Sequence, residues 1–229
     1  MRRSFVTAAV TAALCAAFFA MTPSVFAGDD KPEAKNIIIY PDTGLTVSVV
    51  DTYVPASTRV AILPAVDRTG ERAENRREGQ ARAAYENMLD QFKTHGFQVV
   101  PQDEVNAAVA KSGIDLNDDE EYRRDNFYGI ADAVGADLVI FAVVTDATQD
   151  VKKAGIFSSA EKQGRSHVKF WLLDAKKKRA IYSAVVKEGK AAGKSKLFAT
   201  NEGSNRQINS VGNAVKELLD PFMRPYGVK

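Results

Sequence analysis

The sequence predicts an α/β domain with a mixed sheet: a parallel βαβ(αα)β part, then an antiparallel hairpin and a C-terminal amphipathic helix. Three observations predict this fold. Short apolar runs alternate with helical patterns over residues 59–145, two strand patterns then follow one another directly, and the last pattern repeats at helical spacing. Strands separated by a helix form right-handed parallel units, whereas strands joined by a short turn pair antiparallel.

The first strand and helix open the parallel part. Residues 59–66 form a short apolar run closed by the polar loop 67–75, which is typical of a buried parallel strand that leads into a crossover. Residues 76–95 should form a helix that ends at Gly96. Its apolar residues recur four, three and four positions apart and share one face: Ala81, Tyr85, Met88 and Phe92.

Two more strands and two more helices complete this part. Residues 97–100 are a short strand, and a short helix at 102–111 turns three apolar residues inward: Val105, Ala108 and Val109. A further helix is expected at 119–134, with an inner face of Phe127, Ile130, Ala131 and Val134. Residues 137–145 are the most apolar run after residue 27, which predicts the central strand.

The parallel strands should have a defined order. We expect the strands that begin near Arg59, Phe97 and Asp137 to be parallel, because right-handed crossovers connect them. The Asp137 strand should lie next to the Arg59 strand. Two later strands, at residues 166–174 and 179–187, are joined by a short turn and should form an antiparallel hairpin at one side of the sheet.

The last pattern is an amphipathic helix at residues 204–222, with Pro221 and Pro225 marking its end. Its apolar stripe consists of Ile208, Val211, Val215, Leu218, Leu219 and Phe222. An exposed stripe of this length needs a cover. We expect it to pack on the domain's own sheet, because one sheet face would otherwise stay bare.

The N-terminus predicts export. Arg2 and Arg3 precede an uncharged apolar stretch at residues 5–21, and a small residue, Ala27, closes the segment. Residues 1–27 are therefore interpreted as a signal peptide cleaved after Ala27, with a retained membrane anchor as the alternative. Cys15 lies in the middle of the apolar stretch, so the chain is not expected to be a lipoprotein. The expected location is the periplasm or the outside of the cell, reached by the general or the twin-arginine route.

The remaining chain should comprise two parts: an extension at residues 28–58 and a single α/β domain at 59–229. The extension contains a possible hairpin, because two strand patterns flank the turn sequence at residues 41–44. Removing the leader takes away Cys15, which excludes disulfides and thiolate sites. Removal of the leader also takes away Arg2 and Arg3, so 29 of the 31 basic residues remain and equal the 29 acidic residues in number. This balance argues against a nucleic-acid partner.

No residue pattern predicts catalysis or a cofactor, so we expect no catalytic, cofactor-binding or metal-ligating residues. The two histidines, His95 and His167, lie far apart: the first should meet carbonyls at a helix end, and the second should point outward from a strand. Asp118 with Glu121 predicts a helix cap and a capping box. A calcium loop is the alternative reading of this acidic run, but Glu120 stands where that loop needs Gly.

The chain has neither the glycines of a phosphate loop nor a Gly-x-Ser-x-Gly motif. Its densest basic cluster runs from Lys176 to Arg179. This cluster is interpreted as a solvated hairpin tip, with contact to an anionic lipid or cell-wall polymer as the alternative.

Three runs resemble a known family: residues 59–64 (RVAILP), 133–140 (AVGADLVI) and 168–174 (VKFWLLD). They are similar to the envelope domain shared by the curli-secretion protein CsgG, the TolB N-terminal domain and related LpoB-like envelope lipoproteins. The resemblance covers about residues 59–222. It implies a non-enzymatic part of a bacterial cell-envelope assembly that binds partner proteins.

The resulting hypothesis is an exported, non-catalytic envelope adaptor that binds an envelope protein of unknown identity. Residues 146–165 and 189–203 show no pair of alternating strands of roughly 9 to 11 residues, so we expect no stable membrane insertion after signal cleavage. The alternative is a periplasmic hydrolase whose carboxylates, such as Asp67 and Asp146, line one edge of the sheet.

Overall fold

The computed structural model describes residues 37–39, 46–48, 53–71, 74–152, 160–195 and 202–226. All of them belong to one compact unit, Ala34–Lys229. The expected signal peptide, its cleavage site and most of the extension lie outside these residues. The described part has the predicted α/β class, with a mixed sheet and a C-terminal helix.

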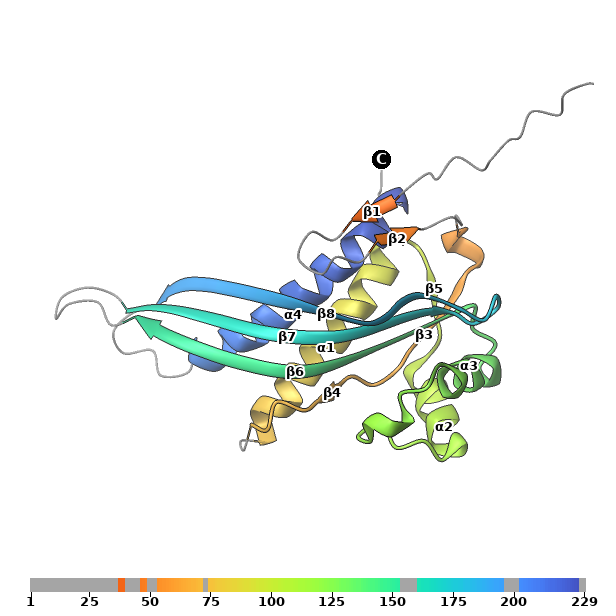
Figure 1. Ribbon diagram of the computed structural model, residues 1–229, viewed down its shortest axis with the longest axis horizontal. Helices are drawn as coiled ribbons and strands as arrows, with labels where there is room; N and C mark the ends of the chain where they lie inside the picture. Colours follow the sequence, from red (N-terminus) through yellow and green to blue (C-terminus); the bar gives the residue numbers. More distant parts are fainter. Residues whose placement is uncertain are drawn as a thin grey trace, which may run out of the picture. The chain divides into compact units, whose positions relative to one another are not determined.

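The main sheet has the predicted order (Figure 1). Its strands run β5, β3, β6, β7, β8, and their bounds are β3 Arg59–Ile62, β5 Gln98–Val99, β6 Leu138–Lys152, β7 Ala160–Asp174 and β8 Arg179–Ser195. β3 pairs parallel with both β5 and β6, while β6, β7 and β8 pair antiparallel. A short β4 (Val66–Asp67) continues beside β6. The expected neighbours of the central strand are therefore confirmed.

The last three strands are longer than expected. The sequence predicted that they cover residues 137–145, 166–174 and 179–187, but β6 continues to Lys152, β7 begins at Ala160 and β8 reaches Ser195. A register shift between Val144 and Asp146 interrupts the β6–β7 ladder without ending it. Backbone pairing then continues through polar residues. The segments 146–165 and 189–203 therefore contain the ends of these strands, and the strand bounds expected from the sequence were too short.

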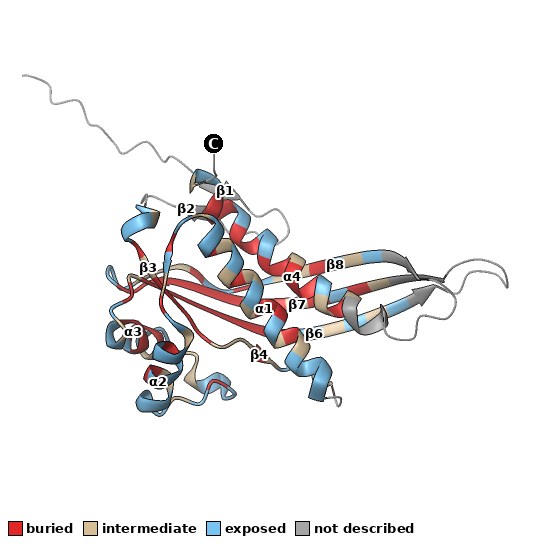
Figure 2. Ribbon diagram, turned by 180° about the vertical axis from the view of Figure 1, so that it is seen from behind, coloured by how far each residue is buried: buried red, intermediate tan, exposed pale blue. Residues whose placement is uncertain are grey.

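One face of the sheet is covered by α1 (Glu74–Thr94) and α4 (Glu202–Met223) (Figures 1 and 2). Alternate residues of β7 point to this face and are buried: Val168, Phe170 and Leu172. Leu218 of α4 is fully buried among them. The prediction that the last helix packs on its own sheet is confirmed. Pro221 lies inside the last turn of α4, and the helix continues to Met223 although this proline removes one helical hydrogen bond.

Two glycines allow α4 to lie unusually close to the sheet. A Cβ atom on Gly189 of β8 would collide with the carbonyl of Ser210 and come within 2.8 Å of the Ala214 Cβ. A Cβ atom on Gly164 of β7 would collide with the carbonyl of Arg206. The backbone of α4 thus rests directly on β7 and β8.

The opposite face is covered at one end by α2 (Gln102–Ser112) and α3 (Arg124–Ala133). Its core is an aromatic cluster in which the rings of Phe141 and Trp171 lie 5.5 Å apart and the ring of Tyr122 lies 5.3 Å from that of Trp171. Such offset and edge contacts add to the stabilisation from burial. The central strand therefore lies between two apolar layers, as its apolar run predicted.

The helix expected from residue 119 begins only at Arg124. Asp118 does cap, but it caps a short 3-10 turn (Asp119–Glu121), with its Oδ1 accepting from the Glu120 amide at 3.0 Å. Arg123 is extended, which interrupts the helix. Glu121 does not complete a capping box, because its Oε2 accepts a hydrogen bond from Asn126 at 2.8 Å. The sequence signature was correct for a cap and wrong for the kind of helix.

Residues before the domain are described in three short pieces, 37–39, 46–48 and 53–58. β1 (Ile37–Ile39) and β2 (Thr46–Ser48) pair antiparallel, at the positions where the hairpin was expected. Tyr53 is tied to the domain: its amide donates to the Tyr226 hydroxyl at 2.9 Å, and its own hydroxyl donates to Asp174 at 2.7 Å. A 3-10 turn (Pro55–Ser57) then leads into β3.

Candidate functional site

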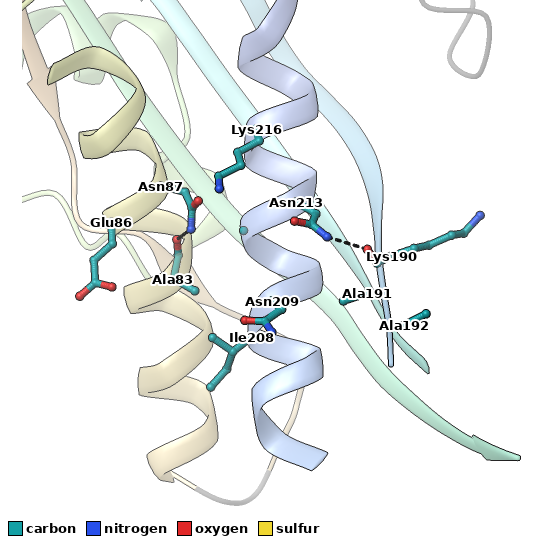
Figure 3. A pocket seen from close by; sticks show the side chains of 11 residues that line it. Ala83, Glu86, Asn87, Lys190, Ala191, Ala192, Ile208, Asn209, Asn213 and Lys216 are labelled. Carbon is teal, nitrogen blue, oxygen red and sulfur yellow. Dashed lines mark hydrogen bonds between the residues drawn. The ribbon is translucent and has the colours of Figure 1, made fainter. Parts of the chain in front are cut away.

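A polar groove runs over the outer face of α4. Its floor consists of α4 residues at helical spacing: Asn209, Gly212, Asn213 and Lys216. One wall is α1, which contributes Glu86 and Asn87, and the other is the edge of β8 at residues 190–192 (Figure 3). The groove has a volume of about 530 Å³. This groove is the candidate binding site.

The groove exists because α4 packs closer to the sheet than α1, which lies beside it, and leaves a hollow between α1 and the edge of β8. The contacts at Gly164 and Gly189 bring α4 against the sheet, so that α1 and β8 rise on either side. Gly212 deepens the floor, since a Cβ atom there would come within 2.7 Å of the Asn87 Nδ2. Gly79 of α1 similarly makes room for Ile208, whose Cδ1 would lie 2.9 Å from an added Cβ atom. Close packing of small residues therefore shapes the groove.

The groove is lined mainly by hydrogen-bonding groups. Asn87 donates to the carbonyl of Ala83 at 2.7 Å, and Asn213 donates to the carbonyl of Lys190 at 2.8 Å. Each carboxamide has two N–H donors and an acceptor oxygen, so both keep capacity for a ligand. Asn209 and Lys216 are exposed. The Lys216 side chain extends toward Asn87 in the space between the two helices (Figure 3). The arrangement suits recognition of a polar, hydrogen-bonding surface.

One wall of the groove is a sheet edge. β8 ends the strand order, so the backbone groups on its outer side have no neighbouring strand of the main sheet to pair with among the described residues. The Lys190 carbonyl points to this side, because it accepts from Asn213 of α4. Successive residues of a strand alternate in direction, so the backbone of Ala192 points the same way. The edge therefore presents backbone donors and acceptors beside the groove.

The two histidines lie outside the groove. His95 Nδ1 is 2.7 Å from the carbonyl of Gln91, which is the contact with a helix-end carbonyl that the sequence predicted. His167 points outward from β7, also as predicted, and its Nδ1 lies 3.3 Å from Asp146 Oδ2. The sequence did not predict this cross-strand pair, because the pairing of β6 with β7 extends beyond the expected strand ends.

The carboxylates of the hydrolase alternative do not meet. Asp67 lies opposite Val144, a residue of the core beneath α1 and α4, and it accepts two hydrogen bonds from Thr69. Burial raises the pKa of Asp67. Asp146 pairs with His167, which points to the other face of the sheet from its buried neighbour Val168. The two carboxylates therefore lie on opposite faces of the sheet and cannot act on one substrate.

The basic cluster at the β7–β8 turn is neutralised locally. Lys176 lies 3.8 Å from Asp137, Lys178 lies 2.6 Å from Asp132, and Arg179 lies 3.9 Å from Asp174. Lys178 is also 5.1 Å from the centre of the Tyr128 ring. Lys176, Lys177 and Lys178 are exposed, as expected of a solvated tip, and the turn also contacts α3 and Tyr53. These contacts leave little uncompensated charge for an anionic polymer.

A second, smaller hollow of about 270 Å³ lies beside this turn and includes Tyr53, Asp174 and Lys177. Its polar groups bind each other: Asp174 accepts from the Tyr53 hydroxyl at 2.7 Å and from the Lys177 amide at 2.8 Å. Burial and then the hydrogen bond to Asp174 raise the pKa of Tyr53. We interpret this hollow as the anchor of the segment that precedes β3.

Neither a membrane-spanning helix nor a cluster of metal ligands occurs in the part of the chain that the structure describes. No described helix is both long and apolar enough to cross a membrane. No three His, Cys, Asp or Glu side chains lie together as metal ligands within the described ranges. The expectation of no metal or cofactor site stays a prediction for the chain as a whole.

No family model matches this chain, and no curated protein matches it. Several solved structures are similar to part of it. Lipoprotein GNA1162 from Neisseria meningitidis is 15% identical, with 64% of this chain and 86% of that one covered and a TM-score of 0.39. The LpoB C-terminal domain from Salmonella enterica is 20% identical over 62% and 86%, with a TM-score of 0.35. The hypothetical protein CT253 from Chlamydia trachomatis is 14% identical over 75% and 97%, with a TM-score of 0.44.

These are similarities in the arrangement of elements. The similar structures include an LpoB domain, and LpoB-like lipoproteins were among the proteins that the sequence resembles. The CsgG and TolB part of that resemblance stays a prediction.

No pattern in the sequence indicates the groove. Asn209, Asn213 and Lys216 look like the ordinary polar face of an amphipathic helix. The glycines that lower α4 are not distinctive, because their partners lie on other elements. Gly189, in the middle of a strand, is the one available signal, since a glycine there often marks a close backbone approach.

Proposed function

We propose that this chain is an exported, non-catalytic adaptor that binds a partner protein of the cell envelope through the α4 groove. The observation that supports it is the groove itself, a polar hollow of about 530 Å³ bounded by an open sheet edge. Stable protein interfaces bury about 800 Å² on each partner. The groove and the β8 edge together offer a continuous polar surface on which such an interface can be centred.

The side chains of the groove favour binding over chemistry. Carboxamides donate and accept hydrogen bonds but do not ionise near neutral pH, so they cannot act as a general acid or base. The titratable side chains of its walls and floor are Glu86, which points away from the groove at the rim of α1, Lys190, which points to the other face of the sheet, and Lys216 (Figure 3). A catalytic pair needs a base within about 3 Å of its nucleophile. The groove is therefore better suited to hold a surface than to transform a substrate.

Export is the second part of the proposal, and it rests on residues 1–27 of the sequence. The proposal is that cleavage after Ala27 releases a mature protein without a lipid anchor into the periplasm or the medium. The mass and N-terminal sequence of the exported protein test it. A mature chain that begins at Gly28 supports it, whereas a chain retained in the membrane with residues 1–27 attached contradicts it.

Binding is tested with a pair of matched variants. Asn209→Arg places a bulky cation on the groove floor, and Asn106→Arg makes the same change at an exposed position of α2, on the other face of the sheet. Each mature protein is used to isolate its partner from envelope extracts, with equal thermal stability as the condition for comparison. We expect Asn209→Arg alone to lose the partner that wild type retains. Equal recovery by both variants would contradict the groove as the binding site.

A further inference from the structure

We propose that the β1–β2 hairpin is a strap that docks on the beginning of β8 and covers the outer edge of residues 179–184. The occupant of this part of the edge is thus a segment of the same chain. Regular pairing of another strand with β8 is then confined to residues 188–192, beside the groove. The inference goes beyond the proposed function and does not depend on it, because it concerns a contact within one chain.

The first observation is the contact between the two elements. Cα atoms of β2 lie within 8 Å of Cα atoms of β8, although the two strands belong to separate sheets. Neighbouring strands that share hydrogen bonds lie about 4.8 Å apart. A shift of at most about 3 Å would therefore bring β2 into hydrogen-bonding distance of β8.

The second observation is that the hairpin needs support. Each of its strands has three residues, and a two-stranded sheet of this size is at best marginally stable alone in water. β1 consists of three isoleucines, and Val47 is the middle residue of β2. Such β-branched residues favour a pleated, partly buried surface. The edge of β8, which β2 contacts, can provide that surface.

The third observation is a short tether that ends at the beginning of β8. The Tyr53 hydroxyl donates to Asp174 at 2.7 Å, and Asp174 lies opposite Arg179, the first residue of β8. Ser48, the last residue of β2, precedes Tyr53 by five positions and can lie no more than about 18 Å from it. A short tether gives an effective concentration of about 1 mM, which favours the hairpin over a separate chain.

The fourth observation is the irregular start of the β8 edge. The register with β7 shifts on both sides of Leu172, so Ile181, Ser183 and Ala184 have no register partner on β7. Ala184 also has a φ of 56°, in the left-handed region. Bulges of this kind turn an edge away from regular pairing and suit a short cover. A three-residue strand such as β2 therefore fits this part of β8 better than a long strand from another chain.

Hydrogen exchange of the mature protein tests the cover. Val47→Pro removes a backbone N–H from β2, and Val47→Thr is the matched control that keeps a β-branched residue. We expect Val47→Pro alone to raise exchange at residues 179–184 at least about tenfold, because that edge then opens more readily, and to leave residues 188–192 unchanged. Equal exchange at residues 179–184 in wild type and Val47→Pro would overturn the proposal.

Cysteine pairs give a second measurement that does not depend on how the proline affects folding. The mature protein has no cysteine of its own, because the single cysteine of the chain precedes residue 28. Val47→Cys is combined in turn with Ala180→Cys, Ile181→Cys or Ser183→Cys, and with Ala192→Cys as the control. Two cysteines form a disulfide only if their Cα atoms come within about 7 Å. At least one of the first three pairs should oxidise within the monomer, seen as the loss of two hydrogens by mass, and the control pair should not.

A second copy of the chain is the competing occupant. Disulfides that form between two chains and not within one would assign the contact to that copy and overturn the proposal. Absence of a disulfide from all three pairs, or equal oxidation of the control pair, would also overturn it. The proposed function has a separate readout. If the cysteine pairs fail but Asn209→Arg still loses the envelope partner, only the strap is wrong.

Discussion

The two ends of the sheet are built in different ways. We call the residues between both helical layers the basal segment: β3, β5 and residues 138–144 of β6, with residues 168–174 of β7. The distal segment comprises residues 146–150, 163–167 and 188–192. In the basal segment the central strand β6 is apolar and buried on both faces, as at Ile140 and Phe141. In the distal segment only one face is covered.

The covered face of the distal segment packs through small residues, Gly164, Ser166 and Gly189, against the backbone of α4. Its other face bears cross-strand charges, such as Asp150 with Arg165 at 3.9 Å. Little apolar area is buried there, so this segment contributes less to stability. It instead provides the open edge and the groove. The comparison indicates that stability and recognition are assigned to different ends of the same strands.

The largest expected effect is in the helix that spans both segments. Leu218 is fully buried, so Leu218→Ala should reduce the free energy of unfolding by about 2 to 5 kcal/mol. Urea unfolding of the mature protein measures this loss. Export should be unchanged, because the leader is recognised separately. A variant as stable as wild type that fails to bind its partner would instead make this stripe an interface.

A smaller loss is expected where α4 meets the distal segment. Gly189→Val places side-chain atoms where the Ser210 carbonyl and Ala214 already lie, and overpacking of this kind costs about 1 to 3 kcal/mol. It should also displace α4 and abolish partner binding. Gly129→Val on α3, where an added Cβ atom meets nothing, is the control for binding. Retention of full binding by Gly189→Val would show that the groove does not depend on this contact.

A small gain is expected from Asp67→Asn. Burial raises the pKa of Asp67, so the folded state binds its proton more tightly than the unfolded state. The folded state is therefore penalised as pH rises through that pKa, and the penalty is absent at lower pH. The variant should be slightly more stable than wild type at neutral pH, and the difference should vanish in acid. Urea unfolding at several pH values measures it; a loss of stability at neutral pH would contradict the sign.

The smallest effect is expected on the charged face of the distal segment. Arg165 and Asp150 are both largely exposed, so Arg165→Ala should change the free energy of unfolding by between 0 and about 1 kcal/mol. Added salt should reduce even this difference. A loss comparable to that of Leu218→Ala would mean that this face is covered and carries part of the core.

The same division explains what the sequence could predict. The basal strands are recognisable because residues 138–144 and residues 170–173 form unbroken apolar runs, since these strands are buried on both faces. The distal strands have no such contrast, since polar and small residues occupy both faces. Their pairing follows from the antiparallel ladder that begins in the basal segment.

The groove could not be predicted because it depends on tertiary contacts. Gly212 is buried only because Asn87 of α1 lies over it, and the two residues are far apart in the sequence. The helix cap at Asp118 shows a related limit: the local hydrogen bond was predictable, but the extended Arg123 that ends the turn was not. Local chemistry fixes single contacts, while the site arises from the packing of three elements.

The most direct test of the central claim is photo-crosslinking in the producing cells. A photoreactive amino acid replaces Asn209 in the groove or Asn106 on α2 in the full chain, and crosslinked products are resolved by mass. The account predicts one discrete adduct with an envelope protein from position 209 and none from position 106. The same adducts from both positions, or an adduct from position 106 alone, would contradict the assignment of recognition to the α4 groove.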